Sequence, residues 1–155
     1  ATPAATTSAT SLSDKLVELL PTTGIAYSPS FQPLIKVPVF FWCDVPEAIT
    51  KKMEIVGEIV TVQLKPTFIW HYGDGTFFMT RKAGAPYPDG EIQHTYSNQG
   101  HYLIELITRW EGTFTVDGAT APIPGKIDTV SVAPISVVAA PSRFTPPVLY
   151  KKGTP

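Results

Sequence analysis

Sixteen prolines are spread through this chain of 155 residues, and they limit its fold more than any other feature. Proline has no backbone N–H and interrupts helix interiors and central strands, so it marks loops, strand ends and extended segments. Short runs of apolar and β-branched residues lie between the prolines, glycines and aspartates. This pattern argues against a long helical bundle and predicts an all-β fold, an antiparallel β-sandwich.

The expected strands are residues 34–43, 53–64, 67–72, 91–96, 102–110 with an extension to 116, and 126–138. Pro38 indicates an edge position for the first of them, and Gly57 indicates a bulge in the second. The segments between them at 24–33, 44–52 and 117–125 contain turn residues and predict loops or irregular connections.

The clearest alternation lies in residues 102–110, where successive side chains are expected to face opposite sides of a sheet. One side would carry Tyr102, Ile104, Leu106 and Thr108, and the other Leu103, Glu105, Ile107 and Arg109.

Three parts are expected along the chain: an N-terminal tail over 1–33, the sandwich over 34–139, and a proline-rich arm over 140–155. The tail contains one predicted helix over 12–20, whose apolar face would carry Leu12, Leu16, Leu19 and Leu20. A helix this short is marginal alone in water, so its leucines must dock, either on their own domain or on a neighbouring subunit as an assembly helix.

The charge pattern excludes several functions. Charged residues make up only 16% of the chain and the formal net charge is −1, with no cationic stripe of the kind that nucleic acids require.

No apolar run approaches the ~20 residues of a membrane helix. Cys43 lies in an apolar run and is expected as a buried side chain, although a reactive or intermolecularly paired thiol is the alternative.

Two segments carry a recognisable motif. The first is Trp-His-Tyr-Gly-Asp-Gly-Thr at 70–76, and the second combines His-Thr-Tyr at 94–96 with Gly-His-Tyr at 100–102. Together they resemble the PKD (polycystic kidney disease) domain family, an immunoglobulin-like sandwich. The segment between them, Ala-Gly-Ala-Pro-Tyr-Pro-Asp at 83–89, looks similar to the version of this domain in secreted actinobacterial proteins. The motif residues are Trp70, Gly73, Asp74, Gly75, His94, Tyr96, Gly100 and Tyr102.

Each motif residue also has a physical reason. Trp70 supplies a large aromatic side chain for the core, and the two glycines around Asp74 permit a tight reversal that its carboxylate can stabilise. Tyr102 is expected to form a tyrosine corner, with its hydroxyl bonded to upstream backbone. His71 departs from the family pattern, which has an acidic residue there, so a calcium site beside Asp74 is not expected.

No residue is assigned a catalytic role, and no metal or cofactor is expected. The three histidines lie on separate predicted segments, and the acidic residues sit at turns, where aspartate is common for hydrogen-bonding reasons. The chain has no nucleophile elbow, phosphate-binding glycine loop or zinc-protease motif.

The resemblance implies a secreted or cell-surface module that binds or spaces rather than catalyses. The expected partner is a protein, including another copy of the chain, with a glycan as a second candidate. Aromatic residues placed in loops or tails are the candidate contacts: Phe77, Phe78, Tyr87 and Phe144. The alternatives are a structural subunit of an appendage, filament or particle assembled through its tails, and an accessory domain of a secreted hydrolase.

Overall fold

The computed structural model describes residues 15–140, and every paired strand in them runs antiparallel to its neighbour. The strands are β1 (Ile25–Ser28), β2 (Val39–Cys43), β3 (Ile49–Ile55), β4 (Glu58–His71), β5 (Phe77–Thr80), β6 (Gln93–His94), β7 (Gly100–Val116), β8 (Ala119–Pro122) and β9 (Ile127–Val137). The predicted all-β class is therefore confirmed.

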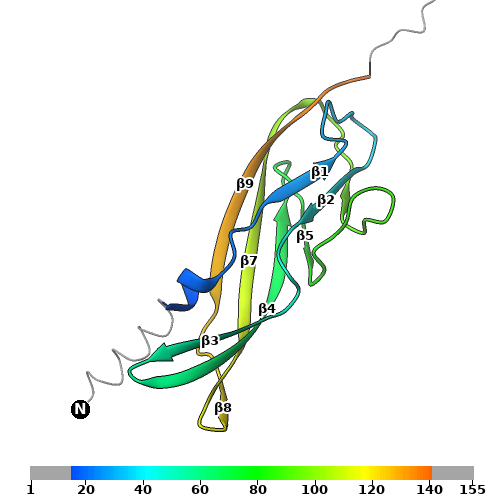
Figure 1. Cartoon of the computed structure of the whole chain (residues 1–155). Coiled ribbons are helices and arrows are strands. Elements are labelled where there is room, and N and C mark those ends of the chain that lie inside the picture. The colour runs from blue at the N-terminus through cyan, green and yellow to red at the C-terminus, as the bar shows by residue number, and fades with distance from the viewer. Residues whose placement is uncertain (1–14, 141–155) are drawn as a thin grey trace, which may run out of the picture.

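Two sheets of unequal size make up the molecule (Figure 1). The smaller has the order β1-β2-β6. In the larger, the long strands β4 and β7 pair along the centre. Strands β3 and β5 pair with successive parts of β4, while β8 and β9 pair with successive parts of β7. The smaller sheet lies over the half of the larger one that contains β5, and the half that contains β3 and β8 extends beyond it.

The core lies between the facing sides of the two sheets. Phe41 of β2 contacts Trp70 of β4, with ring centroids 5.7 Å apart. Ile104 and Leu106 of β7 are fully buried on the same side, while Leu103, which precedes them in the strand, faces the opposite side and is exposed. The alternation predicted for residues 102–110 is confirmed, and it places one side of β7 in the core.

The two strands predicted at 53–64 and 67–72 have different boundaries in the structure. Residues 56 and 57 form the turn of a β3–β4 hairpin, with φ of 50° at Val56 and 78° at Gly57. Gly57 is therefore a turn residue and not a bulge, since two successive positive φ angles suit a tight hairpin. Strand β4 runs on through Pro66, because β3 pairs with β4 only up to Leu64 and the pairing of β4 with β5 starts only at Phe68.

Other strand boundaries correct the predictions. Three segments expected as loops or irregular connections contain strands: β1 lies in 24–33, β3 begins in 44–52, and β8 lies in 117–125. The first predicted strand is shorter, since β2 begins after Pro38, and it pairs on both sides instead of lying at an edge. The strand predicted at 91–96 reduces to the two residues of β6. Sequence runs this short do not reveal their pairing partners.

The packed domain also begins earlier than residue 34, because β1 pairs with β2 and Leu16 is 1% exposed in the core. Residues 15–19 form the described part of the predicted helix. Leu16 and the partly buried Leu20 pack on their own domain, and Leu19 is 38% exposed. Leu12 and Phe144 lie outside the described residues, as do residues 1–14 of the predicted N-terminal tail and 141–155 of the predicted C-terminal arm. Within residues 15–140, no helix has the length and apolar character to cross a membrane.

Candidate functional site

The turn after β4 is fixed by Asp74. The N–H of Tyr72 donates to the carbonyl of Thr76 at 3.1 Å, and Asp74 Oδ1 accepts bonds from the N–H of Thr76 at 3.2 Å and from its hydroxyl at 2.5 Å. Gly73 has a φ of 88°, and a Cβ there would lie 2.8 Å from the carbonyl oxygen of Leu103. Only glycine fits this position, because a side chain there would clash with the backbone of β7.

His94 of β6 joins the smaller sheet to this turn. Its Nε2 lies 2.7 Å from Asp74 Oδ2, which makes a hydrogen bond when Nε2 carries the proton. The imidazole stacks on the ring of Tyr72 at a centroid distance of 4.1 Å and an interplanar angle of 2°. Tyr96 meets the imidazole edge-on and donates its hydroxyl to the carbonyl of Tyr72 at 2.7 Å. His94 thereby contacts Asp74, Tyr72 and Tyr96, and it joins β6 of the smaller sheet to the turn that follows β4 of the larger sheet.

Tyr102, near the start of β7, completes the cluster. Its hydroxyl donates to the carbonyl of Asn98 at 2.7 Å, and its ring lies 4.5 Å from that of Tyr96. This bond ties the entry of β7 to backbone four residues upstream, as expected for a tyrosine corner. We refer to Tyr72, Asp74, His94, Tyr96 and Tyr102 as the turn cluster.

The surroundings of Asp74, Tyr72 and Tyr96 shift the pKa of each of these three groups away from its ordinary value. Partial burial alone would raise the pKa of Asp74, but its hydrogen bonds with Thr76 and His94 outweigh burial and lower the pKa below its usual value. Burial raises the pKa of Tyr72 to about 12, and burial likewise raises the pKa of Tyr96. At neutral pH the carboxylate is therefore ionised and both phenols are protonated, so Asp74 accepts the hydrogen bonds that close the turn and Tyr96 donates one to backbone.

The three histidines lie in different places. His71 stacks on Phe77 with ring centroids 5.8 Å apart, and the exposed His101 places Nδ1 2.8 Å from the hydroxyl of Ser136. His94 is held by Asp74. Within the described residues, no three His, Cys, Asp or Glu side chains gather in a way that could hold a metal ion.

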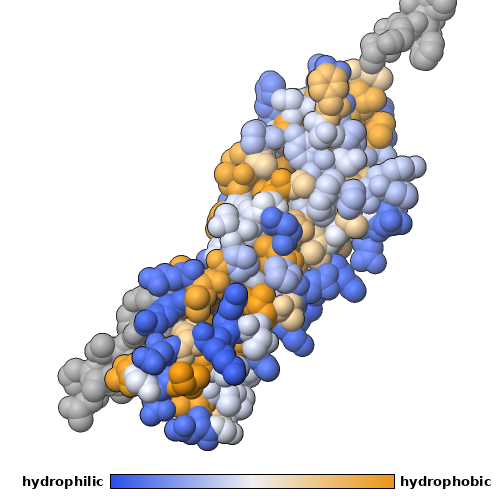
Figure 2. Space-filling model, viewed as in Figure 1, coloured by the Kyte–Doolittle hydropathy of each residue, from blue (hydrophilic) through white to orange (hydrophobic). Residues whose placement is uncertain are grey.

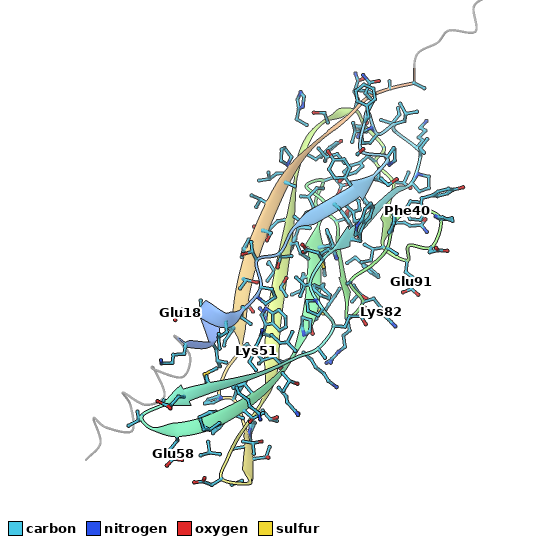
Figure 3. All side chains as sticks on the ribbon, viewed as in Figure 1. Glu18, Phe40, Lys51, Glu58, Lys82 and Glu91 are labelled. Atoms are coloured by element: carbon cyan, nitrogen blue, oxygen red, sulfur yellow. The ribbon has the colours of Figure 1, made fainter. Side chains whose placement is uncertain are left out.

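Three of the predicted aromatic contacts, Phe77, Phe78 and Tyr87, lie among the described residues and are exposed, but two of these do not lie in a loop. Phe77 and Phe78 belong to β5 and are 63% and 43% exposed. Tyr87 lies in the loop after β5, is 69% exposed, and touches Phe40 edge-on at 5.4 Å. Figure 3 shows Phe40 on the same flank of the molecule as Lys82 and Glu91.

Sequence reasoning missed the outer face of the larger sheet, the side opposite the core. The apolar residues on this face are Ile69, Phe77, Met79, Leu103, Ile107, Val130, Val132 and Pro134. Half-buried His71 and Glu105 lie among them. The signal was present in the sequence, because both sides of the 102–110 strand contain apolar residues, whereas a solvated side would be polar.

Sequence reasoning also missed a shallow hollow on the smaller sheet. It is lined by Ile25, Ala26, Tyr27, Ser28, Ser30 and Trp42. Trp42 is paired with Ala26 on one side and bridged to Gly84 on the other, so its neighbours in the sheet are small. On the side of the molecule seen in Figure 2, most of the strongly hydrophilic residues gather over the half that contains β3 and β8, away from the smaller sheet.

Comparison of the chain with protein-family models, with curated proteins and with solved structures finds no match.

Proposed function

We propose that this protein is a non-catalytic, PKD-like binding module that acts outside the cell, and that its principal partner is a protein. The turn cluster supports the non-catalytic role. Both carboxylate oxygens of Asp74 are already engaged by Thr76 and His94 of the same chain. The residues that carry the resemblance therefore serve stability, and a binding function falls to exposed surfaces elsewhere.

The outer face of the larger sheet is the observation that carries the proposal. Five of its apolar side chains are more than half exposed: Phe77, Met79, Leu103, Val130 and Val132. Single exposed apolar residues are ordinary on soluble proteins, but a contiguous group spanning several strands marks an interaction surface. The smaller sheet covers the opposite side. No strand among the described residues packs on the outer face, so this face is free for a partner.

The chemistry of a hollow on the larger sheet supports a non-catalytic role. This hollow lies where β3 gives way to β5 along β4 and contains Lys65, Arg81 and Glu111 as its charged residues. Acid–base catalysis requires two titratable groups with different proton affinities around one substrate. A single exposed carboxylate beside two cations does not provide that pair.

Site-specific photo-crosslinking in the cells that produce the protein tests the proposal. A photoreactive amino acid at Val132, which is 56% exposed on the outer face, should cross-link a protein. The same group at Val56, 86% exposed at the tip of the β3–β4 hairpin, is the matched control and should give little product. Equal labelling from the two positions, or none from Val132, would refute a protein-binding role for this face.

The hollow beside Trp42 favours a second candidate function, the binding of a neutral glycan. An aromatic ring beside serine hydroxyls, with no charged residue in the lining, suits the apolar faces and hydroxyls of a sugar. Trp70 and Trp110 are buried, so a change in tryptophan fluorescence on adding a soluble oligosaccharide would report on Trp42. Saturable quenching by cellohexaose or chitohexaose that Trp42→Ala abolishes supports this function, and unchanged fluorescence with both argues against it.

A further inference from the structure

The edge of the larger sheet along β9 is long and open. Strand β9 pairs with β7 on one side over its whole length, Ile127–Val137, and no strand of the described residues pairs with its other side. Figure 1 shows β9 running along one margin of the sheet. The other edge strands of this sheet are shorter, and the longest of them, β3, carries Lys51 and Lys52, side chains of the kind that protect an edge against pairing. Strand β9 contains no lysine.

Pro134 shows which backbone groups of β9 face the open edge. Proline has no N–H, so Pro134 can lie within a paired strand only with its nitrogen pointing away from β7. In an antiparallel strand the N–H and C=O of one residue point to the same side, and successive residues alternate between the two sides. Asp128, Val130 and Val132 therefore direct their N–H and C=O groups toward the open edge.

Printed bonds at the end of the strand agree with this direction. Val138 belongs to the same alternating set, and it donates its N–H to the carbonyl of Pro33 at 2.9 Å and accepts from the N–H of Ile35 at 3.0 Å. The edge thus already bonds a segment of its own chain just beyond β9. From Asp128 to Pro134, a length of roughly 20 Å, this side of the strand bonds no backbone of the described residues.

The side chains beside the open edge lie in two rows. Val130 and Val132 are on the outer face and are 58% and 56% exposed. Thr129 and Ser131 face the core side, where Ser131 donates its hydroxyl to the carbonyl of Thr23 at 2.9 Å. A strand added here would continue both rows, because cross-strand neighbours share a face. Its favoured pattern is apolar residues beside the valines, alternating with small polar residues on the core side.

We infer that the β9 edge from Asp128 to Pro134 binds an extended segment of a partner protein by strand addition, an inference that deepens the proposed protein-binding function and rests on it. The open N–H and C=O groups select this occupant, because an extended chain presents acceptors and donors at the same repeat. A single strand needs only about 4.8 Å of width. A second copy that paired through its own β9 would bring a second segment 21–24 to the core side of the same seam, where the first copy already has one.

Fluorescence anisotropy of a labelled peptide with the purified full chain tests the inference. The probe is fluorescein-Lys-Val-Thr-Val-Thr-Val-Lys-amide, which has the alternating pattern that the two rows favour. We expect saturable binding with a Kd on the order of 100 μM or lower. Two further peptides are N-methylated, one at two valines and the other at both threonines. Only one of these sets faces β9 in an added strand, so one peptide should bind at least about tenfold more weakly and the other nearly as the parent does.

Val130→Pro is the corresponding change in the protein. Proline removes an N–H from the open edge and places a ring carbon in the path of the added strand, while the bonds between β9 and β7 remain. Val130→Thr is the matched control, because it keeps the β-branched shape and the N–H. Circular dichroism verifies that both variants are folded. We expect the proline variant to raise the Kd of the parent peptide at least about tenfold and the threonine variant to change it less than about threefold.

Three outcomes would overturn strand addition: no saturable binding of the parent peptide up to about 1 mM, equal binding of the two methylated peptides, or equal Kd values for the two variants. If Val130→Pro does not fold, the methylated peptides decide alone. If strand addition fails but Val132 cross-links a protein in cells, the proposed function stands; if Val132 cross-links nothing, the proposed function fails as well.

Discussion

Replacement of Asp74 by alanine offers a direct measure of how strongly the turn cluster holds the two sheets together. The substitution removes the contact with His94 and both bonds from Thr76. Hydrogen bonds to a charged group contribute about 1.5–3 kcal/mol each when well shielded. The side chain of Asp74 is 22% exposed, so solvent weakens these contacts, and we expect a total loss of about 3 kcal/mol. In a domain of this size that corresponds to roughly 10 °C in Tm.

The loss should depend on pH in a defined direction. The pKa of Asp74 is lower in the folded chain than in the unfolded chain, so its stabilisation is complete above the unfolded value of about 3.9. Stabilisation then declines as the pH falls through the lower folded pKa, where the native carboxylate takes up a proton. The pKa of Asp128 is also lowered, chiefly by its hydrogen bond with Arg109, but Asp74→Ala retains that pair. Subtracting the two stability curves therefore isolates Asp74.

Urea unfolding, followed by circular dichroism from pH 7 to about pH 2.5, supplies the measurement. Asp89→Ala is the control, because Asp89 is an exposed turn aspartate and its replacement should change stability by less than about 0.5 kcal/mol. The reasoning would be refuted if Asp74→Ala matched this control at pH 7. It would equally be refuted if the loss at pH 2.5 were as large as at pH 7.

Two pairs of substitutions and one labelling reaction test the fold further. Tyr96→Phe should cost about 1–2 kcal/mol because it leaves a buried carbonyl unpaired, whereas Tyr72→Phe should be neutral or stabilising because the Tyr72 hydroxyl is buried without a partner among the described residues; paired urea titrations compare them. Gly112→Ala should cost about 3 kcal/mol or more, since its Cβ would overlap a carbonyl oxygen of β4, while Gly24→Ala has room and should cost far less in thermal unfolding. Cys43 is 6% exposed and burial raises the pKa of its thiol, so a thiol reagent should label it only when urea unfolds the chain; rapid labelling of the native protein would contradict its burial.

The sequence determined the structural class and the local geometry of the turn cluster. Prolines and glycines at short intervals argued against long helices and favoured strands, and alternation in residues 102–110 gave the buried side of β7. The Gly-Asp-Gly reversal and the Tyr102 corner were predictable because a turn is closed by residues close in sequence. The motif also includes His94, but its stacking on Tyr72 was not predictable from local sequence.

Only the tertiary structure decided how the strands are shared between the sheets. Pro66 indicates a break in the sequence but lies within β4, because β3 and β5 leave that point of the strand unpaired on one side. The outer face likewise exists only after pairing, since Met79, Ile107 and Val130 come from segments far apart in the chain and meet through cross-strand register. Strand propensity depends on the neighbours a residue acquires, so local sequence can specify a strand without specifying what it lies beside.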